Sequence, residues 1–402
     1  MCIRDRRYSY YEYDESGRAT ASYHSGDADR VDIHYAANGD RVVLDSLGNA
    51  TVYQTRIENK RGVLDGISGP ICSQGCGQTD VQYSYDAQLN VTSKTSYGIT
   101  TRYGDYDAKG QPGYMIEAAG LPEERRTEFQ YDARFLNRIT RITEPSVYPG
   151  ASRITSRNYD VHGNLASETV AGFDPSGGPV SRTITHVFDG PLGQLSATDG
   201  PRTDVDDVTT YEYYPNQPAE GPNRARLRAV VDPSGIRTRE EIVYSATGKI
   251  LSEARPNGVT INYEYYDGND RIKSVTESGG GAFNRTRWEY FPTGDVQRVI
   301  VDDESGDEII SQFVYDPAGR LRRIESRVGS APAFLADQWV SYEFDAAGNV
   351  VTETRESRDT PLNNIVIERV FDAYDRLDIT TQGGVSADFD YNPDGTLAAK
   401  AD

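Results

Sequence analysis

The most informative segment of the chain reads Tyr315-Asp316-Pro317-Ala318-Gly319-Arg320-Leu321. Asp at the first position and Gly at the fourth position of a four-residue turn are typical of a type I turn, in which Pro is favoured at the second position. The Asp carboxylate can accept backbone N–H groups within the turn, and Gly adopts a positive φ at little steric cost. The segment therefore predicts a tight turn between a strand that ends at Tyr315 and a strand that begins at Leu321.

The same unit of aromatic residue, Asp, two variable residues, Gly, polar residue and aliphatic residue recurs along almost the whole chain. Its best-preserved copies contain Tyr13 and Asp14; Tyr106, Asp107 and Gly110; Tyr159, Asp160 and Gly163; Tyr315, Asp316 and Gly319; and Phe344, Asp345 and Gly348. Degenerate copies begin at Tyr35, Tyr85, Tyr131, Phe188, Tyr214, Tyr244, Tyr266, Tyr290, Phe371 and Tyr391. The spacing is about 20 to 30 residues, apart from one gap between Tyr35 and Tyr85, which indicates a repeat architecture built from one hairpin unit.

The segments between the turns alternate in polarity at period two. In Thr260–Tyr265, the side chains of Ile261, Tyr263 and Tyr265 fall on one face of a strand and polar side chains on the other. A lone hairpin is only marginally stable, and sheets twist, so the hairpins must pair side by side. We predict an all-β fold: one extended antiparallel sheet of repeated β-hairpins that winds as a spiral and forms an open arc. Successive tyrosines should stack as ladders along it. A set of separate β-sandwiches is the alternative, which the regular turn offset disfavours.

Composition restricts the class of protein. The 402 residues carry a net charge of −20 and include 28 Tyr, so the chain is too aromatic for a disordered segment. The acidic balance argues against a nucleic-acid partner, because binding to a phosphate backbone requires a cationic surface. The sequence contains no run near the roughly 18 apolar residues that a membrane helix requires, so no membrane span is expected.

The two ends of the chain predict its organisation. Residues 1–7 lack the design of a signal peptide, and we interpret them as a non-native N-terminal stub. Residues 8–402 form the hairpin array, and the repeat pattern continues into the last residues. We therefore expect the array to be incomplete at both ends and the chain to be a piece of a longer protein.

The two cysteines of the array, Cys72 and Cys76, are the one compact unusual feature. A local disulfide in an exported chain and two unpaired loop thiols are about equally compatible with this spacing. A zinc site is less so, because it needs about four ligands and no second pair of Cys or His has a matching spacing. We predict no metal site and keep the disulfide as a possibility.

No catalytic or cofactor-binding constellation is present in the sequence. The four His residues have no partner arrangement that indicates a general base, and no phosphate-binding loop, nucleophile elbow or zinc-protease motif occurs. The repeated Asp residues are too periodic to be catalytic and are assigned to the turns. We expect a protein that is not an enzyme and has no cofactor.

The repeated unit resembles the YD (tyrosine-aspartate) repeat of the Rhs proteins, with related repeats in shell components of insecticidal toxin complexes and in teneurins. The resemblance covers roughly residues 8–402 and rests on about fifteen copies. It implies a spiral β-sheet that forms part of a hollow shell, which in bacterial members encloses a variable C-terminal toxin.

The resemblance implies a non-enzymatic segment of an exported bacterial shell, secreted or at the cell surface. Its partners would be a toxin passenger or the remaining shell segments of the same polypeptide. The alternative is a surface adhesion or carbohydrate-binding array, in which exposed tyrosines stack on glycans.

Overall fold

The computed structural model confirms the all-β fold and the single extended antiparallel sheet. It describes the whole chain except residues 1–8, 25–29, 47, 72–78, 97, 123, 147, 149, 175, 268–269, 303–307, 317–318, 330–335, 346–347, 359–363, 373–375, 392–396 and 402. The predicted stub at residues 1–7 lies outside this part. The described residues contain 32 strands, joined into one sheet.

The first sixteen strands cover the N-terminal half of the sheet. They are β1 Ser9–Tyr13, β2 Ala19–His24, β3 Val31–Tyr35, β4 Arg41–Leu44, β5 Ala50–Glu58, β6 Arg61–Ile71, β7 Thr79–Tyr85, β8 Val91–Ser96, β9 Ile99–Gly104, β10 Tyr114–Glu117, β11 Arg125–Tyr131, β12 Ile139–Pro145, β13 Ser152–Tyr159, β14 Leu165–Phe173, β15 Pro179–Val187 and β16 Ala197–Asp199.

The remaining strands continue the same sheet to the C-terminal end. They are β17 Val208–Tyr213, β18 Leu227–Val231, β19 Arg237–Tyr244, β20 Ile250–Ala254, β21 Thr260–Tyr265, β22 Ile272–Gly279, β23 Ala282–Tyr290, β24 Val296–Asp302, β25 Glu308–Tyr315, β26 Leu321–Val328, β27 Gln338–Phe344, β28 Val350–Ser357, β29 Ile365–Phe371, β30 Leu377–Gln382, β31 Val385–Tyr391 and β32 Leu397–Ala401. A short 3₁₀ helix, η2 (Pro218–Asn223), lies between β17 and β18.

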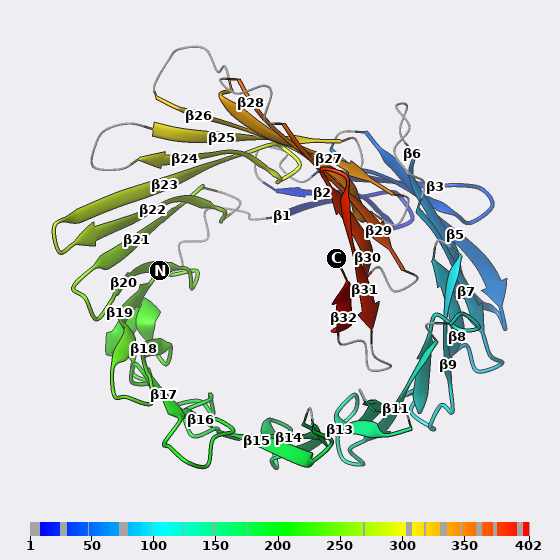
Figure 1. Cartoon of the computed structure of the whole chain (residues 1–402), viewed down its shortest axis with the longest axis horizontal. Helices are drawn as coiled ribbons and strands as arrows, with labels where there is room; N and C mark the ends of the chain where they lie inside the picture. The colour runs from blue at the N-terminus through cyan, green and yellow to red at the C-terminus, as the bar shows by residue number, and fades with distance from the viewer. Residues whose placement is uncertain are drawn as a thin grey trace.

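Every described strand pairs with the next one along the chain, and all these pairings are antiparallel, so the sheet is one long meander. The strands follow one another around a ring, and β29–β32 lie inside its outline in this view (Figure 1). Among the described strands, β1 pairs only with β2 and β32 only with β31, so the sheet does not close into a barrel. A twisted ribbon of this length therefore forms an open spiral.

The strand segments bury one face more than the other, as their polarity predicts. Along β21, burial alternates from residue to residue, and Ile261 is only 5% exposed while Thr260 and Asn262 are exposed. Because the sheet is a single layer, each unit is stabilised mainly by its neighbours along the ribbon, as in other repeat proteins.

A β-bulge lies next to many of the turns. Where the repeat aromatic ends a strand, the pairing shifts by one residue, as between Val314, which faces Arg323, and Tyr315, which faces Leu321. Such a bulge increases the local twist. Repeated at successive hairpins, it contributes to the coiling of the sheet.

Among the described residues, η2 is the one helical element. In the part of the chain that the structure describes, no helix is long and apolar enough to cross a membrane.

Candidate functional site: the repeated turn and the tyrosine tether

The turn at Asp160 shows how the conserved spacing of the unit works. The Gly163 N–H donates to the Asp160 carbonyl oxygen at 3.2 Å, and the Asp160 N–H donates to the Asn164 carbonyl at 2.9 Å. The carboxylate Oδ1 of Asp160 accepts the N–H groups of His162 and Asn164, at 2.8 and 2.9 Å. Gly163 has φ +82°, a conformation that side chains with a Cβ rarely adopt. Asp and Gly thus stabilise the same four-residue turn, the first through its carboxylate and the second through its positive φ.

The polar residue after Gly completes the turn. Asn164 donates its Nδ2–H to the second carboxylate oxygen of Asp160 at 2.9 Å. Gln111 does the same to Asp107 at 2.7 Å, and the guanidinium of Arg320 reaches Asp316 at 2.7 Å. Every carboxylate oxygen of these turns therefore accepts a hydrogen bond.

These hydrogen bonds favour the ionised carboxylate. The Gln111 backbone N–H, followed by its side-chain amide, lowers the pKa of Asp107. The Arg134 guanidinium, together with the Arg134 backbone N–H, lowers the pKa of Asp132 to about 2. The turns are therefore held by charged acceptors at neutral pH.

The repeat tyrosine connects its unit to the preceding one. The Tyr315 hydroxyl donates to the backbone carbonyl of Val296, 3.0 Å away, which is the aliphatic residue that follows the glycine of the preceding unit. We call this contact the tyrosine tether. It also occurs at Tyr35, Tyr85, Tyr106, Tyr131, Tyr159, Tyr213, Tyr244, Tyr265, Tyr290 and Tyr391. Tyr13, in the first described unit, is instead 62% exposed.

A cationic side chain often covers the ring of the repeat aromatic residue. The guanidinium of Arg376 lies 4.2 Å from the centroid of the Tyr391 ring, and that of Arg320 lies 4.8 Å from the ring of Phe344. Both arginines also pair with the Asp of their own turn. One arginine thus links the turn of its own unit to the aromatic residue of the next.

The predicted repeat residues occupy equivalent places in the structure. Glycine has a positive φ at Gly110, Gly163, Gly319 and Gly348, and each of these glycines donates its N–H to the carbonyl of the Asp three residues earlier. The aromatic residues Tyr106, Tyr159, Tyr315 and Phe344 immediately precede those Asp residues, and the first three are tethered.

Three degenerate units are offset by one residue from the sequence interpretation, and two of them make tethers; in the third, predicted from Phe188, the turn begins at Gly190 and not at Asp189. The tethers are made by Tyr213 and Tyr265, whereas the sequence interpretation began these units at Tyr214 and Tyr266. Adjacent tyrosines make the sequence ambiguous, and the register of the sheet decides between them. Ring contacts are of both kinds: Tyr10 and Tyr23 stack with centroids 5.2 Å apart, as expected, whereas Tyr266 and Tyr290 meet edge to face with centroids 6.0 Å apart.

The same turn also forms outside the predicted series of units, at Asp45, Asp174 and Asp232. In the gap between Tyr35 and Tyr85, Gly48 donates its N–H to the Asp45 carbonyl at 2.9 Å, and Asn49 donates to the Asp45 carboxylate at 2.9 Å. Leu44 stands where the tyrosine would be. The Asp-to-Gly spacing followed by Asn was the available signal.

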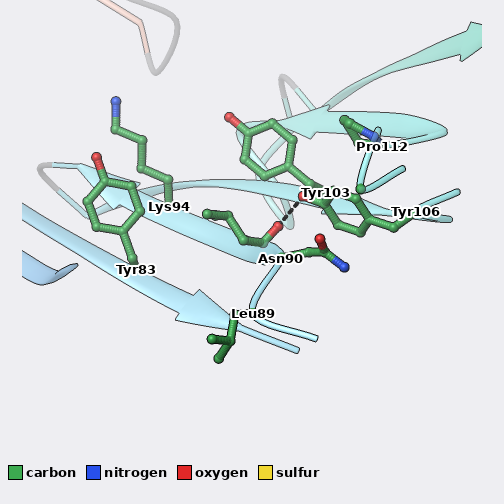
Figure 2. Close-up of a pocket in the computed structure, with 9 residues that line it drawn as sticks. Tyr83, Leu89, Asn90, Lys94, Tyr103, Tyr106 and Pro112 are labelled. Atoms are coloured by element: carbon green, nitrogen blue, oxygen red, sulfur yellow. Dashed lines mark hydrogen bonds between the residues drawn. The ribbon is translucent and has the colours of Figure 1, made fainter. Parts of the chain in front are cut away.

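A surface pocket of about 450 Å³ lies over β7, β8 and β9. Its walls include Tyr83, Lys94 and Tyr103, and Leu89, Val91 and Pro112 add apolar surface. Figure 2 shows that the side chains of Tyr83, Lys94 and Tyr103 rise to the same side of the sheet. Below them, the hydroxyl of Tyr106 makes its tether to Val91.

The remaining predictions are not tested by this geometry. Cys72 and Cys76 lie outside the described residues, so their disulfide stays a prediction. Within the described ranges, no group of three or more His, Cys, Asp or Glu side chains is placed to hold a metal ion.

Several solved structures share this fold. The crystal structure of TcdB2-TccC3 matches with a TM-score of 0.58, and that of TcdB2-TccC3-Cdc42 with 0.59; both are 13% identical. The Tc holotoxin pore of Photorhabdus luminescens matches with a TM-score of 0.57 at 13% identity. Each match covers 98% of this chain but only 25–26% of the other, so the chain spans about a quarter of those proteins.

The likeness lies in the fold. No family model matches the chain, and no curated protein matches it in sequence. At this level of identity, the solved structures show that the repeated hairpins wind as the corresponding part of a toxin complex does.

Proposed function

We propose that the chain is a non-enzymatic wall segment of an Rhs-type β-shell, which encapsulates or presents a C-terminal toxin. One observation carries the proposal: an unbroken spiral of hairpins that matches structures of a toxin complex over 98% of its length. The YD-like repeat units support the same assignment. On this proposal, the protein is exported, and its partners are the passenger and the other shell segments.

The physical properties of the sheet suit a container wall. In a long meander, each interior strand has both edges paired, so few strand edges are left to associate with a passenger that is not yet folded. The turn recurs along the array and the tyrosine tether in most units, which favours a similar rotation between successive hairpins. A wall of constant curvature can therefore be extended by adding units.

The decisive experiment uses the whole reading frame that contains this stretch. The coding sequence is read beyond Asp402, the full protein is expressed, and the folded product is treated with protease. We expect a C-terminal domain that resists digestion within the intact protein but is degraded rapidly when expressed alone. Equal digestion rates of the enclosed and isolated domain would overturn encapsulation, as would further repeats that lead to a wall anchor.

The absence of catalysis is a separate part of the proposal. A screen of the purified chain against hydrolase substrates should give no turnover above background. Turnover that one acidic substitution abolishes would contradict the scaffold assignment.

A further inference from the structure

Lys94 is the one cationic side chain among the residues that line the pocket over β7, β8 and β9. Lys94 on β8 lies directly opposite Tyr83 on β7, and Thr101 on β9 faces Lys94 from the other side. Tyr103 follows two residues after Thr101 on the same face of the sheet. Directly opposed and diagonal positions are within reach of long side chains. The ammonium and both phenol hydroxyls therefore lie above one region of the sheet, as Figure 2 shows.

Lys94 stands at a position that is acidic in three other units, apolar in several more and basic again at Lys400. It is the third residue after the aliphatic position of its unit, and the equivalent residues of three other units are Glu168, Glu253 and Glu353. Each of these glutamates is paired: with Arg157 at 2.7 Å, Arg255 at 2.7 Å and Arg369 at 2.7 Å, respectively. Lys94 has no ion-pair or hydrogen-bond partner among the described residues. The charged side chain at this position is thus paired in those three units, whereas the ammonium of Lys94 can bind a ligand.

Of the three tyrosines that line the pocket, Tyr83 and Tyr103 are not tethered. Tyr85 and Tyr106 donate their hydroxyls to backbone carbonyls, whereas Tyr83 and Tyr103 have no hydrogen-bond partner among the described residues. Burial, with a smaller contribution from Glu117, raises the pKa of Tyr103 above its ordinary value. Glu117 itself is paired with Arg125 at 2.6 Å. Two free hydroxyl donors therefore accompany the free ammonium.

We propose that this pocket binds an acidic saccharide, with Lys94 pairing with the carboxylate of a hexuronate unit. The Tyr83 and Tyr103 hydroxyls would donate to the same carboxylate or to ring hydroxyls. The apolar surface of Leu89, Val91 and Pro112, with the tyrosine rings, suits the C–H face of a pyranose. A bare oxyanion would leave this apolar surface unused, and the volume of about 450 Å³ exceeds what such an ion needs. The proposal does not depend on encapsulation, since the site is formed by three adjacent strands and the turns that join and follow them.

The test measures binding of a galacturonate tetrasaccharide to the full chain by titration calorimetry. We expect saturable binding by the wild-type protein and none of the matching neutral galactose tetrasaccharide. Inorganic phosphate, at the concentration at which galacturonate monomer displaces the tetrasaccharide, should not compete. Equal competition by phosphate would overturn the saccharide assignment and leave only a general anion site.

The variants separate the pocket from the rest of the surface. Lys94→Gln should weaken binding roughly tenfold or more, because a hydrogen-bonded charge is lost, and Tyr83→Phe or Tyr103→Phe roughly twofold to tenfold. Lys94→Glu should abolish binding; the strand is expected to accommodate it, since Glu stands at this position in three other units. Lys400→Gln is the matched control, because Lys400 occupies the same position in the last described unit, opposite Phe389.

Thermal unfolding of each variant verifies that the fold is retained. Absence of saturable binding by the folded wild-type chain would overturn the proposal, as would an unchanged affinity in folded Lys94→Gln. Either result would leave the encapsulation proposal standing, because that proposal is tested by protease protection of the passenger.

Discussion

The neighbouring units that begin at Tyr315 and Phe344 make the same turn but link to the preceding unit differently. In both, Gly donates its N–H to the Asp carbonyl, and the Asp carboxylate accepts the N–H of the residue after Gly. Tyr315 adds a tether to the Val296 carbonyl at 3.0 Å. Phe344 has no hydroxyl to donate, and the guanidinium of Arg320 covers its ring instead.

The comparison shows which parts of the unit can be exchanged. The turn requires a positive φ at its fourth position, which few residues adopt. The Asp acceptor stabilises the turn, although Ala36, Arg255 and Phe291 take its place in other units. The link between units needs an aromatic ring at a strand end. Either the hydroxyl of that ring donates to a backbone carbonyl, or a cation covers the ring. We therefore expect substitutions in the turn to cost more stability than substitutions in the link.

The largest effect is expected for Gly319→Val. Gly319 has φ +78°, and a Cβ built there has no atom within 4 Å, so the cost is backbone strain alone. We expect a loss of about 1–3 kcal/mol in the free energy of unfolding. Gly62→Val is the matched control: Gly62 also has open space around it but no positive φ, so it should leave stability almost unchanged. Equal denaturation midpoints for the two variants would contradict the assigned turn.

A smaller effect is expected for Tyr315→Phe, which makes this unit resemble its neighbour. The ring stays, and one hydrogen bond to a backbone carbonyl is lost, so the free energy of unfolding should fall by about 0.5–1.5 kcal/mol. The reverse change, Phe344→Tyr, should raise the denaturation midpoint if its hydroxyl reaches the carbonyl of Leu321. A Tyr315→Phe variant as stable as the wild type would show that the tether contributes nothing to stability.

The cation over the ring should contribute less still. Arg320→Met keeps much of the side-chain packing but removes the charge over Phe344. It also removes the ion pair with Asp316, in which Nε of Arg320 lies 2.7 Å from Oδ2 of Asp316. We expect a loss of about 0.5–1 kcal/mol from the cation–π contact. Combining it with Phe344→Leu in a double-mutant cycle isolates that contact, and a coupling energy of zero would exclude it.

The smallest effect at neutral pH, but one with a distinctive pH profile, is expected at Asp132. Its folded pKa of about 2 is below the ordinary value of 3.8, so its contribution is present above about pH 4 and is lost as the pH falls toward 2. Asp132→Asn should therefore lower the thermal midpoint at pH 7 and have little effect at pH 2. Ser245→Ala is the control: Ser245 replaces Asp in its turn and accepts the Lys249 N–H at 3.0 Å, so its effect should not follow this titration.

Much of the fold could be predicted because the information in each turn is local. Asp316 and Gly319 specify their turn within four residues, and the alternation around Ile261 specifies which face of its strand is buried. The pairing of adjacent hairpins then follows from chain connectivity. For the same reason, the sequence indicated an array of hairpins and offered no catalytic constellation to place.

Only the tertiary structure decided how the units meet. The carbonyl of Val296 and the hydroxyl of Tyr315 are brought together by strand register, and that register shifts by one residue at each bulge. The choice of Tyr213 over Tyr214 depends on the same register. Tyr83, Lys94 and Tyr103 come from three strands, so only the strand pairing brings their side chains into one pocket. Local turn chemistry is encoded within a few residues, whereas cross-strand contacts depend on the sum of every bulge and loop between them.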